Sequence, residues 1–185
     1  MSTATGGYTV AEYDALIERG ILPETNRFEL IDGRIVEKDM KGPEHRSATE
    51  RTRRAIDRLL PSGWHTSQEA PVQLPNRDSE PEPDVSVIRG TIDDYPDRHP
   101  GPPDIALVVE VTRSTVAKDR ANIPVYGAGG IAVYWIVNIP DRQLEVYTSA
   151  GATVLTEDQL ADLVIDGRVV GQIAVADLLP RNKAR

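Results

Sequence analysis

The feature that most constrains the fold is a pair of apolar runs, IALVVEV at residues 105–111 and AVYWIVN at residues 132–138. Runs of this length, rich in β-branched and aromatic residues, predict buried strands. The first run is interrupted by a carboxylate, Glu110. An ionised carboxylate is costly to bury unless it is paired, hydrogen-bonded or bound to a metal. The position of Glu110 therefore indicates a partner inside the sheet.

The composition places the chain among ordinary globular proteins. It has 185 residues, 39% of them hydrophobic and 27% charged, which suits one domain spanning residues 1–185. No apolar run approaches the ~20 residues of a membrane-spanning helix, and the start MSTATGGYTV lacks the basic-then-apolar pattern of a signal peptide. The absence of cysteine excludes disulfides and thiolate zinc sites. We expect a cytoplasmic protein with no membrane partner.

The net charge of −8 argues against a protein that coats nucleic acid non-specifically. It does not exclude nucleic-acid chemistry, because carboxylates that hold a divalent metal also lower the net charge. One basic cluster lies in residues 45–60, which we expect to form an amphipathic helix. Its arginines are Arg46, Arg51, Arg53, Arg54 and Arg58. They are candidates for nucleic-acid contacts, and the alternative is a solvated helix face.

The other elements follow from periodicity and turn signals. Residues 9–20 predict a helix with Thr9 as N-cap and Gly20 as stop, and Asp32-Gly33 predicts a hairpin turn within residues 27–39. Further strands are expected at 65–74, 84–90, 143–148 and 152–156, a helical region at 118–128, and a hairpin with a final helical turn at 163–179. This order predicts an α+β (mixed α/β) fold around one central sheet.

Two carboxylates stand out by their positions. Asp84 opens one apolar strand, and Glu110 lies inside the next strand, after a long loop. Adjacent strands lie about 4.8 Å apart, so carboxylates on the same face can share one cation. Mg²⁺ is usually held by one or two carboxylates together with waters and substrate phosphate, and it can activate water for phosphodiester attack. The alternative is that Asp84 caps a loop and Glu110 is a structural carboxylate.

Several segments together resemble the Uma-type family of restriction-endonuclease-like proteins, a branch of the PD-(D/E)XK nuclease superfamily. The matching segments, in order, are ELIDGRIVEKD, PEPDVSVIRG, ALVVEVTRSTVAKDR, GGIAVYWIVN and DRQLEVYT. The resemblance runs from about residue 8 to 180. It implies a restriction-endonuclease-like fold, with a central mixed sheet flanked by helices. It also implies that Asp84 and Glu110 are catalytic metal ligands for Mg²⁺ or Mn²⁺, with the Val111 carbonyl as a further ligand.

The sequence departs from the family pattern at the catalytic lysine. The superfamily places a lysine two residues after the second acid, where this chain has Thr112, and Uma-type proteins move it to the position of Asn122. The nearest lysine is Lys118, which would lie one helical turn earlier on the same face if the helix extends that far. Pro124 instead favours a helix start near residue 121. The alternative for Lys118 is a solvated surface lysine.

Other residues have both a functional and a structural interpretation. Glu29 is an outer metal contact or a surface carboxylate of the hairpin, and His45 contacts phosphate or begins a helix. Glu82 is interpreted as a loop charge, and Tyr134 and Trp135 as core residues. We expect Asp119 and Arg120 to form a structural ion pair near the site.

The function that these residues favour is divalent-metal-dependent hydrolysis of DNA by an endonuclease. Asp84 and Glu110 would bind the metal and Lys118 would orient or activate water. The candidates for backbone contacts are Arg46, Arg51, Arg54, Arg58, Arg113 and Arg120. Cutting both strands of a duplex commonly uses two active sites, so we expect a homodimer. The alternatives are a catalytically weak or inactive nuclease-fold protein that binds nucleic acid or a protein partner, and a hydrolase of a small phosphorylated substrate.

Overall fold

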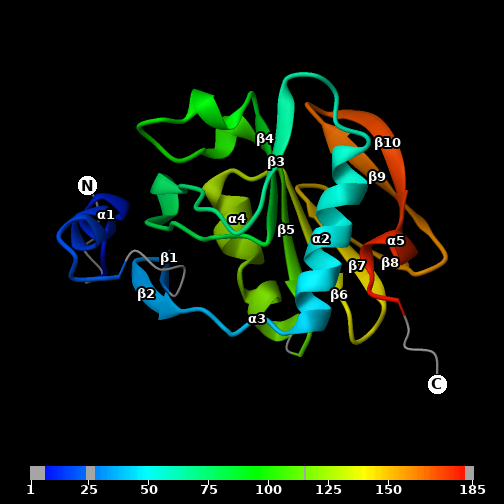
Figure 1. The fold of residues 1–185 in the computed structure, drawn as a ribbon, viewed down its shortest axis with the longest axis horizontal. Coiled ribbons are helices and arrows are strands. Elements are labelled where there is room, and N and C mark those ends of the chain that lie inside the picture. Colours follow the sequence, from blue (N-terminus) through cyan, green and yellow to red (C-terminus); the bar gives the residue numbers. More distant parts are fainter. Residues whose placement is uncertain (1–6, 24–27, 115, 182–185) are drawn as a thin grey trace.

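The computed structural model describes residues 7–23, 28–114 and 116–181, and its centre is a six-stranded mixed sheet (Figure 1). The strand order is β3-β4-β5-β6-β7-β8. The central pair, β5 and β6, is parallel, and the other neighbours are antiparallel. The strands are β3 (Trp64–Ser67), β4 (Val85–Arg89), β5 (Ile105–Thr112), β6 (Val133–Asn138), β7 (Gln143–Thr148) and β8 (Gly151–Thr156). The two apolar runs of the sequence are therefore the two middle strands.

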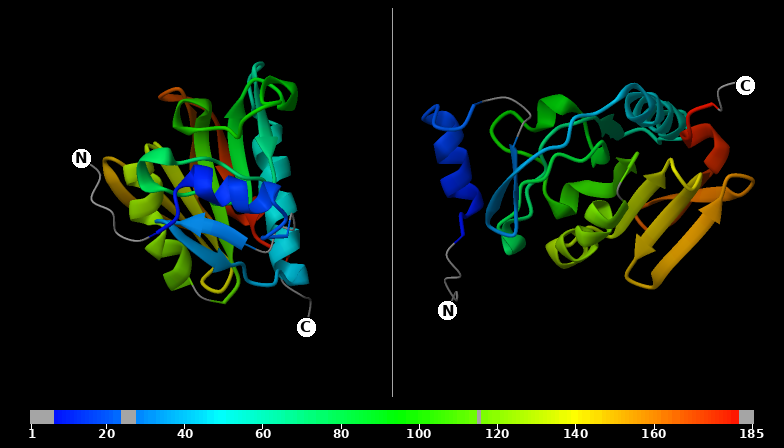
Figure 2. Two further views of the ribbon diagram at one scale, coloured as in Figure 1. Left: turned by 90° about the vertical axis from the view of Figure 1, so that its left-hand side faces the viewer. Right: turned by 90° about the horizontal axis from the view of Figure 1, so that it is seen from below.

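One face of the sheet is covered by α2 (Pro43–Asp57), the hairpin β9 (Leu160–Ile165) and β10 (Arg168–Ala174), and α5 (Val175–Leu178). The other face is covered by α4 (Ile123–Gly129) and the apolar residues Val72 and Leu74. Figure 2 shows the sheet between these two layers. Both faces of β5 and β6 are thus buried, which explains why their sequences are apolar without alternation.

The parallel pair β5–β6 requires a crossover connection. The sequence prediction of one helical region at 118–128 is only approximate, because the structure has two helices, α3 (Val116–Ala121) and α4, with the break at Asn122. Pro124 occupies the first turn of α4, as its missing N–H allows. The helical structure therefore begins at Val116, before the start near residue 121 that Pro124 predicts.

The N-terminal part lies beside the sheet and not in it (Figure 1). Thr9 is the N-cap of α1 (Val10–Glu18), as predicted, and it forms a capping box with Glu12. The predicted hairpin is β1 (Phe28–Ile31) and β2 (Arg34–Glu37), with Asp32 and Gly33 both at positive φ in the turn. Arg27, which the sequence prediction included, lies outside the described residues. A bridge between Leu30 and Glu80 connects this hairpin to the body of the protein.

The remaining segments differ in detail from the sequence prediction. The strand expected at 65–74 ends at Ser67 as β3. Short 3-10 turns occur at Pro75–Arg77, Ile92–Asp94 and Pro102–Asp104. Tyr134 and Trp135 are buried in the core, as predicted. In the part of the chain that the structure describes, no helix has the length and apolar character needed to cross a membrane.

Candidate active site

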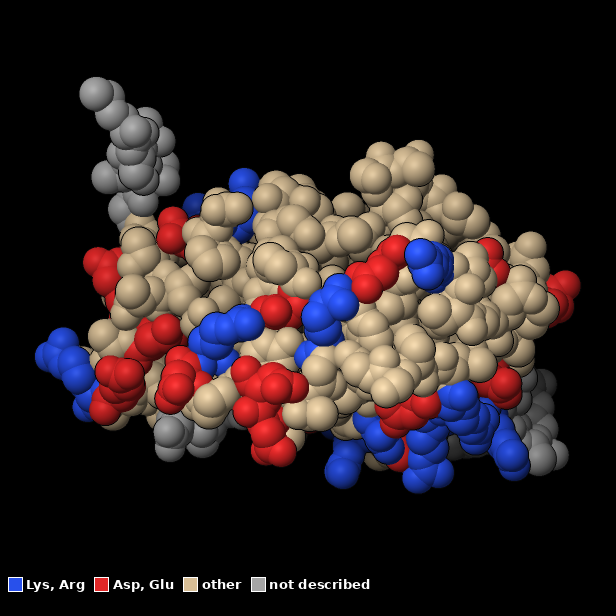
Figure 3. Space-filling view, turned by 90° about the horizontal axis from the view of Figure 1, so that it is seen from above, with Lys and Arg blue, Asp and Glu red and all other residues tan. Residues whose placement is uncertain are grey.

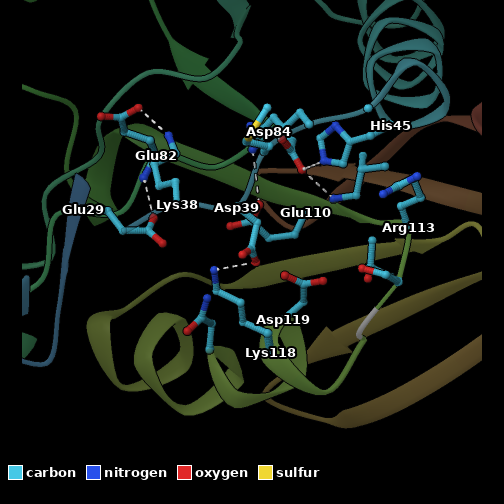
Figure 4. A pocket seen from close by; sticks show the side chains of 17 residues that line it. Glu29, Lys38, Asp39, His45, Glu82, Asp84, Glu110, Arg113, Lys118 and Asp119 are labelled. Atoms are coloured by element: carbon cyan, nitrogen blue, oxygen red, sulfur yellow. Dashed lines mark hydrogen bonds and ion pairs between the residues drawn. The ribbon is translucent and has the colours of Figure 1, made fainter. Parts of the chain in front are cut away.

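The two carboxylates singled out in the sequence lie opposite each other across neighbouring strands. The β4–β5 register pairs Val85 with Val109, so Asp84, one residue before β4, faces Glu110 in β5. The Asp84 amide donates to Glu110 Oε2 at 3.4 Å, and the Val111 amide donates to Asp84 Oδ2 at 2.7 Å. Figure 4 shows both side chains in one pocket of about 130 Å³, which Val111 also lines.

Asp84 is held as an anion by two basic side chains. Lys41 Nζ lies 2.6 Å from Asp84 Oδ1, and His45 Nε2 lies 3.0 Å from Oδ2. Burial alone raises the pKa of Asp84, but hydrogen bonds and charges from His45 and Lys41 outweigh it, so the pKa lies below the usual value. Lys41 also contacts Glu69 at 3.1 Å. His45 therefore begins a helix and also reaches the site, so both interpretations of this residue apply.

Glu110 has a different environment, although it is Asp84's neighbour. Its Oε1 accepts a hydrogen bond from the fully buried Tyr126 hydroxyl at 2.9 Å. Burial away from water raises the pKa of Glu110 well above its usual value, and the negative charges of Asp84, Asp119 and Glu29 raise this pKa further. A cation in the pocket would remove this penalty, because positive charge favours the ionised carboxylate.

Two more carboxylates line the pocket beyond this pair. Glu29 is only 8% exposed, so the interpretation as a surface carboxylate is wrong, and burial raises its pKa. Asp119, which the sequence did not identify as a site residue, has a pKa raised to about 6 by burial. Glu82 lies in the loop before β4, as predicted, but it also lines the pocket and forms an ion pair with Lys38 at 2.5 Å.

Lys118 and Asn122 both line the pocket, at its α3–α4 side. Lys118 Nζ bonds to Asp39 at 2.9 Å, and its side chain is 44% exposed. The lysine that donates a hydrogen bond to Asp84 is instead Lys41, which precedes α2. The sequence contained no signal for Lys41, because it is 43 residues from Asp84 and belongs to no motif.

Most arginines proposed for backbone contacts lie away from the pocket. Arg113 lines it. Arg54 pairs with Glu50 on the exposed side of α2. The expected ion pair between Asp119 and Arg120 is wrong, because Arg120 donates to both oxygens of Glu145 at 2.8 and 2.9 Å. Arg120 therefore anchors α3 to β7. Arg46 and Arg58 lie on α2 and at its C-terminal end, outside the residues that line the pocket.

The donor set fits a hard divalent cation held mainly by Asp84 and Glu110. Among the described residues, no group of three or more His, Cys, Asp or Glu side chains is arranged to hold a metal ion. Mg²⁺ does not need one, since it is commonly bound by one or two carboxylates with water and substrate oxygens. Each carboxylate oxygen has two lone pairs, so Asp84 retains acceptor capacity, and Glu110 Oε2 has only the long 3.4 Å contact.

Comparison with known proteins supports the same architecture. A family model described as "Uma2: Putative restriction endonuclease" matches residues 10–174. A crystal structure of a putative nuclease of the DUF820 family from Anabaena variabilis superposes with a TM-score of 0.72 at 18% identity. The match covers 92% of this chain and 96% of that one. No curated protein sequence matches the chain. The restriction-endonuclease-like fold predicted from the sequence is confirmed by these comparisons.

Proposed function

The chain belongs to the Uma2 family of putative restriction endonucleases, and from this premise we propose that it is a divalent-metal-dependent endonuclease that hydrolyses DNA phosphodiester bonds. The observation that carries the proposal is the pair Asp84 and Glu110, opposite each other in a pocket with an excess of buried carboxylates. The two acids differ in their environments, as acids that share a cation but play different roles commonly do.

The side chains of the pocket have distinct tasks in this proposal. Bound Mg²⁺ or Mn²⁺ would polarise the phosphodiester and lower the pKa of the attacking water. Asp84, kept ionised by His45 and Lys41, offers a preformed anionic ligand. Glu110 offers the second carboxylate, and Tyr126 fixes its orientation through Oε1. Lys118, at the pocket rim, orients water or stabilises charge after leaving Asp39.

The first experiment is calorimetric titration of Mn²⁺ into the wild type, Glu110→Gln and Glu18→Gln. Glu18 lies at the exposed end of α1 and serves as a matched control. We expect binding in the wild type and in Glu18→Gln, and loss of binding in Glu110→Gln. Circular dichroism establishes that each protein is folded. A folded wild type that binds no Mn²⁺ contradicts the metal site.

The second experiment measures cleavage of duplex DNA with Mg²⁺ or Mn²⁺. Asp84→Asn and Glu110→Gln should each lower the cleavage rate by about 10²–10³-fold, because a single electrostatic group at the reacting centre is typically worth that much. Lys118→Ala should reduce the rate but leave Mn²⁺ binding intact. Wild-type rates in either acid variant would disprove the catalytic assignment.

A second candidate function is a catalytically weak or inactive nuclease-fold protein that binds nucleic acid or a protein partner. Two points favour it: the family resemblance leads us to expect a lysine at the position of Asn122, and Lys118 bonds to Asp39 and not to the carboxylate pair. Mn²⁺ binding without turnover on any nucleic acid would support this candidate over the endonuclease.

A further inference from the structure

A second concavity adjoins the pocket and has the opposite charge character. It has a volume of about 800 Å³, and four arginines line it: Arg51, Arg113, Arg142 and Arg181. Glu44 is the acidic residue of its lining. The chain as a whole carries a net charge of −8, so this concentration of arginine runs against its average composition. We call this concavity the arginine groove.

Arg113 connects the arginine groove to the candidate active site. It follows β5 directly, three residues after Glu110, and it lines both the groove and the carboxylate pocket. Its guanidinium lies over Gly42, where an added Cβ would be 3.5 Å from Cζ. Among the residues that the structure describes, none forms a hydrogen bond or ion pair with the Arg113 guanidinium. Figure 4 shows Arg113 at the edge of the pocket, on the His45 side.

Two of the other arginines are fixed in the groove wall. Arg142 forms a two-bond ion pair with Glu157 and also donates to the Pro180 carbonyl. Arg51 donates to the Ala176 carbonyl at 3.3 Å, and its Nε is buried with no hydrogen-bond partner among the described residues. These contacts hold the guanidinium groups in place before any ligand arrives, which lowers the entropy cost of binding.

We infer that the arginine groove binds the phosphate backbone of the DNA strand that flanks the scissile bond, with Arg113 at the junction. The inference rests on the proposed function, which places the scissile phosphodiester beside Asp84 and Glu110. Guanidinium groups match phosphate oxygens in geometry and charge. Contacts of this kind fix the position of a strand without reading its bases. The groove also adjoins the pocket through Arg113, whereas Arg54 lies on the outer, exposed side of α2 and lines neither cavity.

The test compares two double variants that remove the same charge from different places. Arg113→Gln/Arg181→Gln alters the arginine groove, and Arg54→Gln/Arg58→Gln alters the outer face and end of α2. Binding of a fluorescein-labelled DNA duplex is measured by anisotropy in EDTA over a range of salt concentrations, so neither metal nor turnover enters the readout. Circular dichroism and thermal melts monitor folding.

We expect the groove variant to weaken DNA binding about tenfold at low salt. We expect the slope of log K against log salt to fall by nearly two, since each neutralised phosphate contributes about 0.9. The α2 variant should change binding and slope much less. Equal effects of the two double variants, no effect of the groove variant, or a wild type that binds no DNA would each overturn the inference. Competition by polyglutamate as strong as that by unlabelled DNA would indicate an acidic protein partner and would also overturn it.

The outcome is separable from that of the proposed function. If wild-type protein binds DNA through the groove but does not cleave it with Mg²⁺ or Mn²⁺, the endonuclease proposal fails and the groove stands. If the wild type cleaves DNA and the groove variant binds and cleaves it equally well, the groove inference fails and the endonuclease proposal stands.

Discussion

At the residue scale, the site is built on a contrast between two adjacent carboxylates. Asp84 is 2% exposed and remains ionised because Lys41 and His45 contact its two oxygens. Glu110 contacts no basic side chain in the described structure, and burial raises its pKa. In the proposed function, a divalent cation would supply the positive charge that Glu110 lacks, and this would account for a carboxylate inside β5.

Lys41→Met tests how strongly the lysine supports Asp84. Breaking a hydrogen bond to a buried charge costs about 1.5–3 kcal/mol, so the free energy of unfolding should fall by about 2 kcal/mol in metal-free buffer. Lys41→Arg should lose less. Urea denaturation of the wild type, Lys41→Met, Asp84→Asn and the double variant Lys41→Met/Asp84→Asn measures the coupling free energy between the two side chains. Additive effects of the two single changes would show that the contact contributes nothing.

Glu80 provides a pH-dependent test outside the carboxylate pair. Burial raises its pKa to about 7, and Gln73 Nε2 donates to it at 2.8 Å. The group is only 3% exposed. An acid with a raised folded-state pKa favours the folded protein at low pH, and this stability is lost as the pH rises from about 4.5 through 7. Glu80→Gln should therefore match the wild type near pH 5 and exceed its unfolding free energy at pH 8 by about 2–3 kcal/mol. Denaturant titrations at the two pH values measure the unfolding free energies of both proteins. If the variant and the wild type differ by the same amount at both pH values, the raised pKa of Glu80 is contradicted.

How much of the site was predictable depends on where each residue lies in the sequence. Asp84 and Glu110 stand out in the sequence because Asp84 opens an apolar strand and Glu110 interrupts one, and such a pattern is a local property. Lys41 and Asp119 were not identified, because their contacts join distant segments and neither residue interrupts a pattern. Arg120 was assigned to its neighbour Asp119, whereas the fold provides Glu145 on β7, which is 1% exposed and better able to bind a guanidinium.

At the element scale, α3 and the adjoining Asn122 line the pocket opposite α2. The sequence predicts one helical region at residues 118–128, and Pro124 indicates a helix start. The division into α3 and α4 could not be predicted, because α3 has no buried residue and so no apolar face in its sequence. What holds α3 is tertiary contact: Arg120 to Glu145, and the Tyr134 hydroxyl to the Asp119 carbonyl at 3.0 Å.

Arg120→Met should therefore loosen α3 without unfolding the sheet. Glu145 keeps hydrogen bonds from Asn138 and Tyr147, so its burial is still compensated in part. We expect faster hydrogen exchange at the amides of residues 116–121, unchanged exchange in β5 and β6, and a weaker effect of Lys118→Ala on cleavage in this background. Unchanged exchange in α3 would show that Arg120 does not anchor it.

At the scale of the whole molecule, charge and sheet edges are distributed unevenly. Figure 3 shows acidic side chains concentrated toward the end that carries the N-terminal segment, and basic side chains gathered along one edge near the opposite end. Strand order was not predictable from the sequence, because the pattern of each strand says which residues are buried but not which strand is its neighbour.

In the described part of the chain, β8 is an edge strand that could pair the two copies of the expected homodimer. β8 is the last strand of the six-stranded sheet, and most of its side chains are exposed, including Val154 at 51%. An open edge of this length offers unpaired backbone groups to a second copy, and lysine on an edge strand opposes such pairing. Val154→Lys should therefore convert a dimer to a monomer. Val169→Lys, at a similarly exposed valine in β10, is the matched control and should remain dimeric. Light scattering after size-exclusion chromatography gives the mass of each protein over a range of concentrations. A wild type with the mass of one chain throughout that range, or equal dissociation of both variants, would show that β8 does not pair two copies.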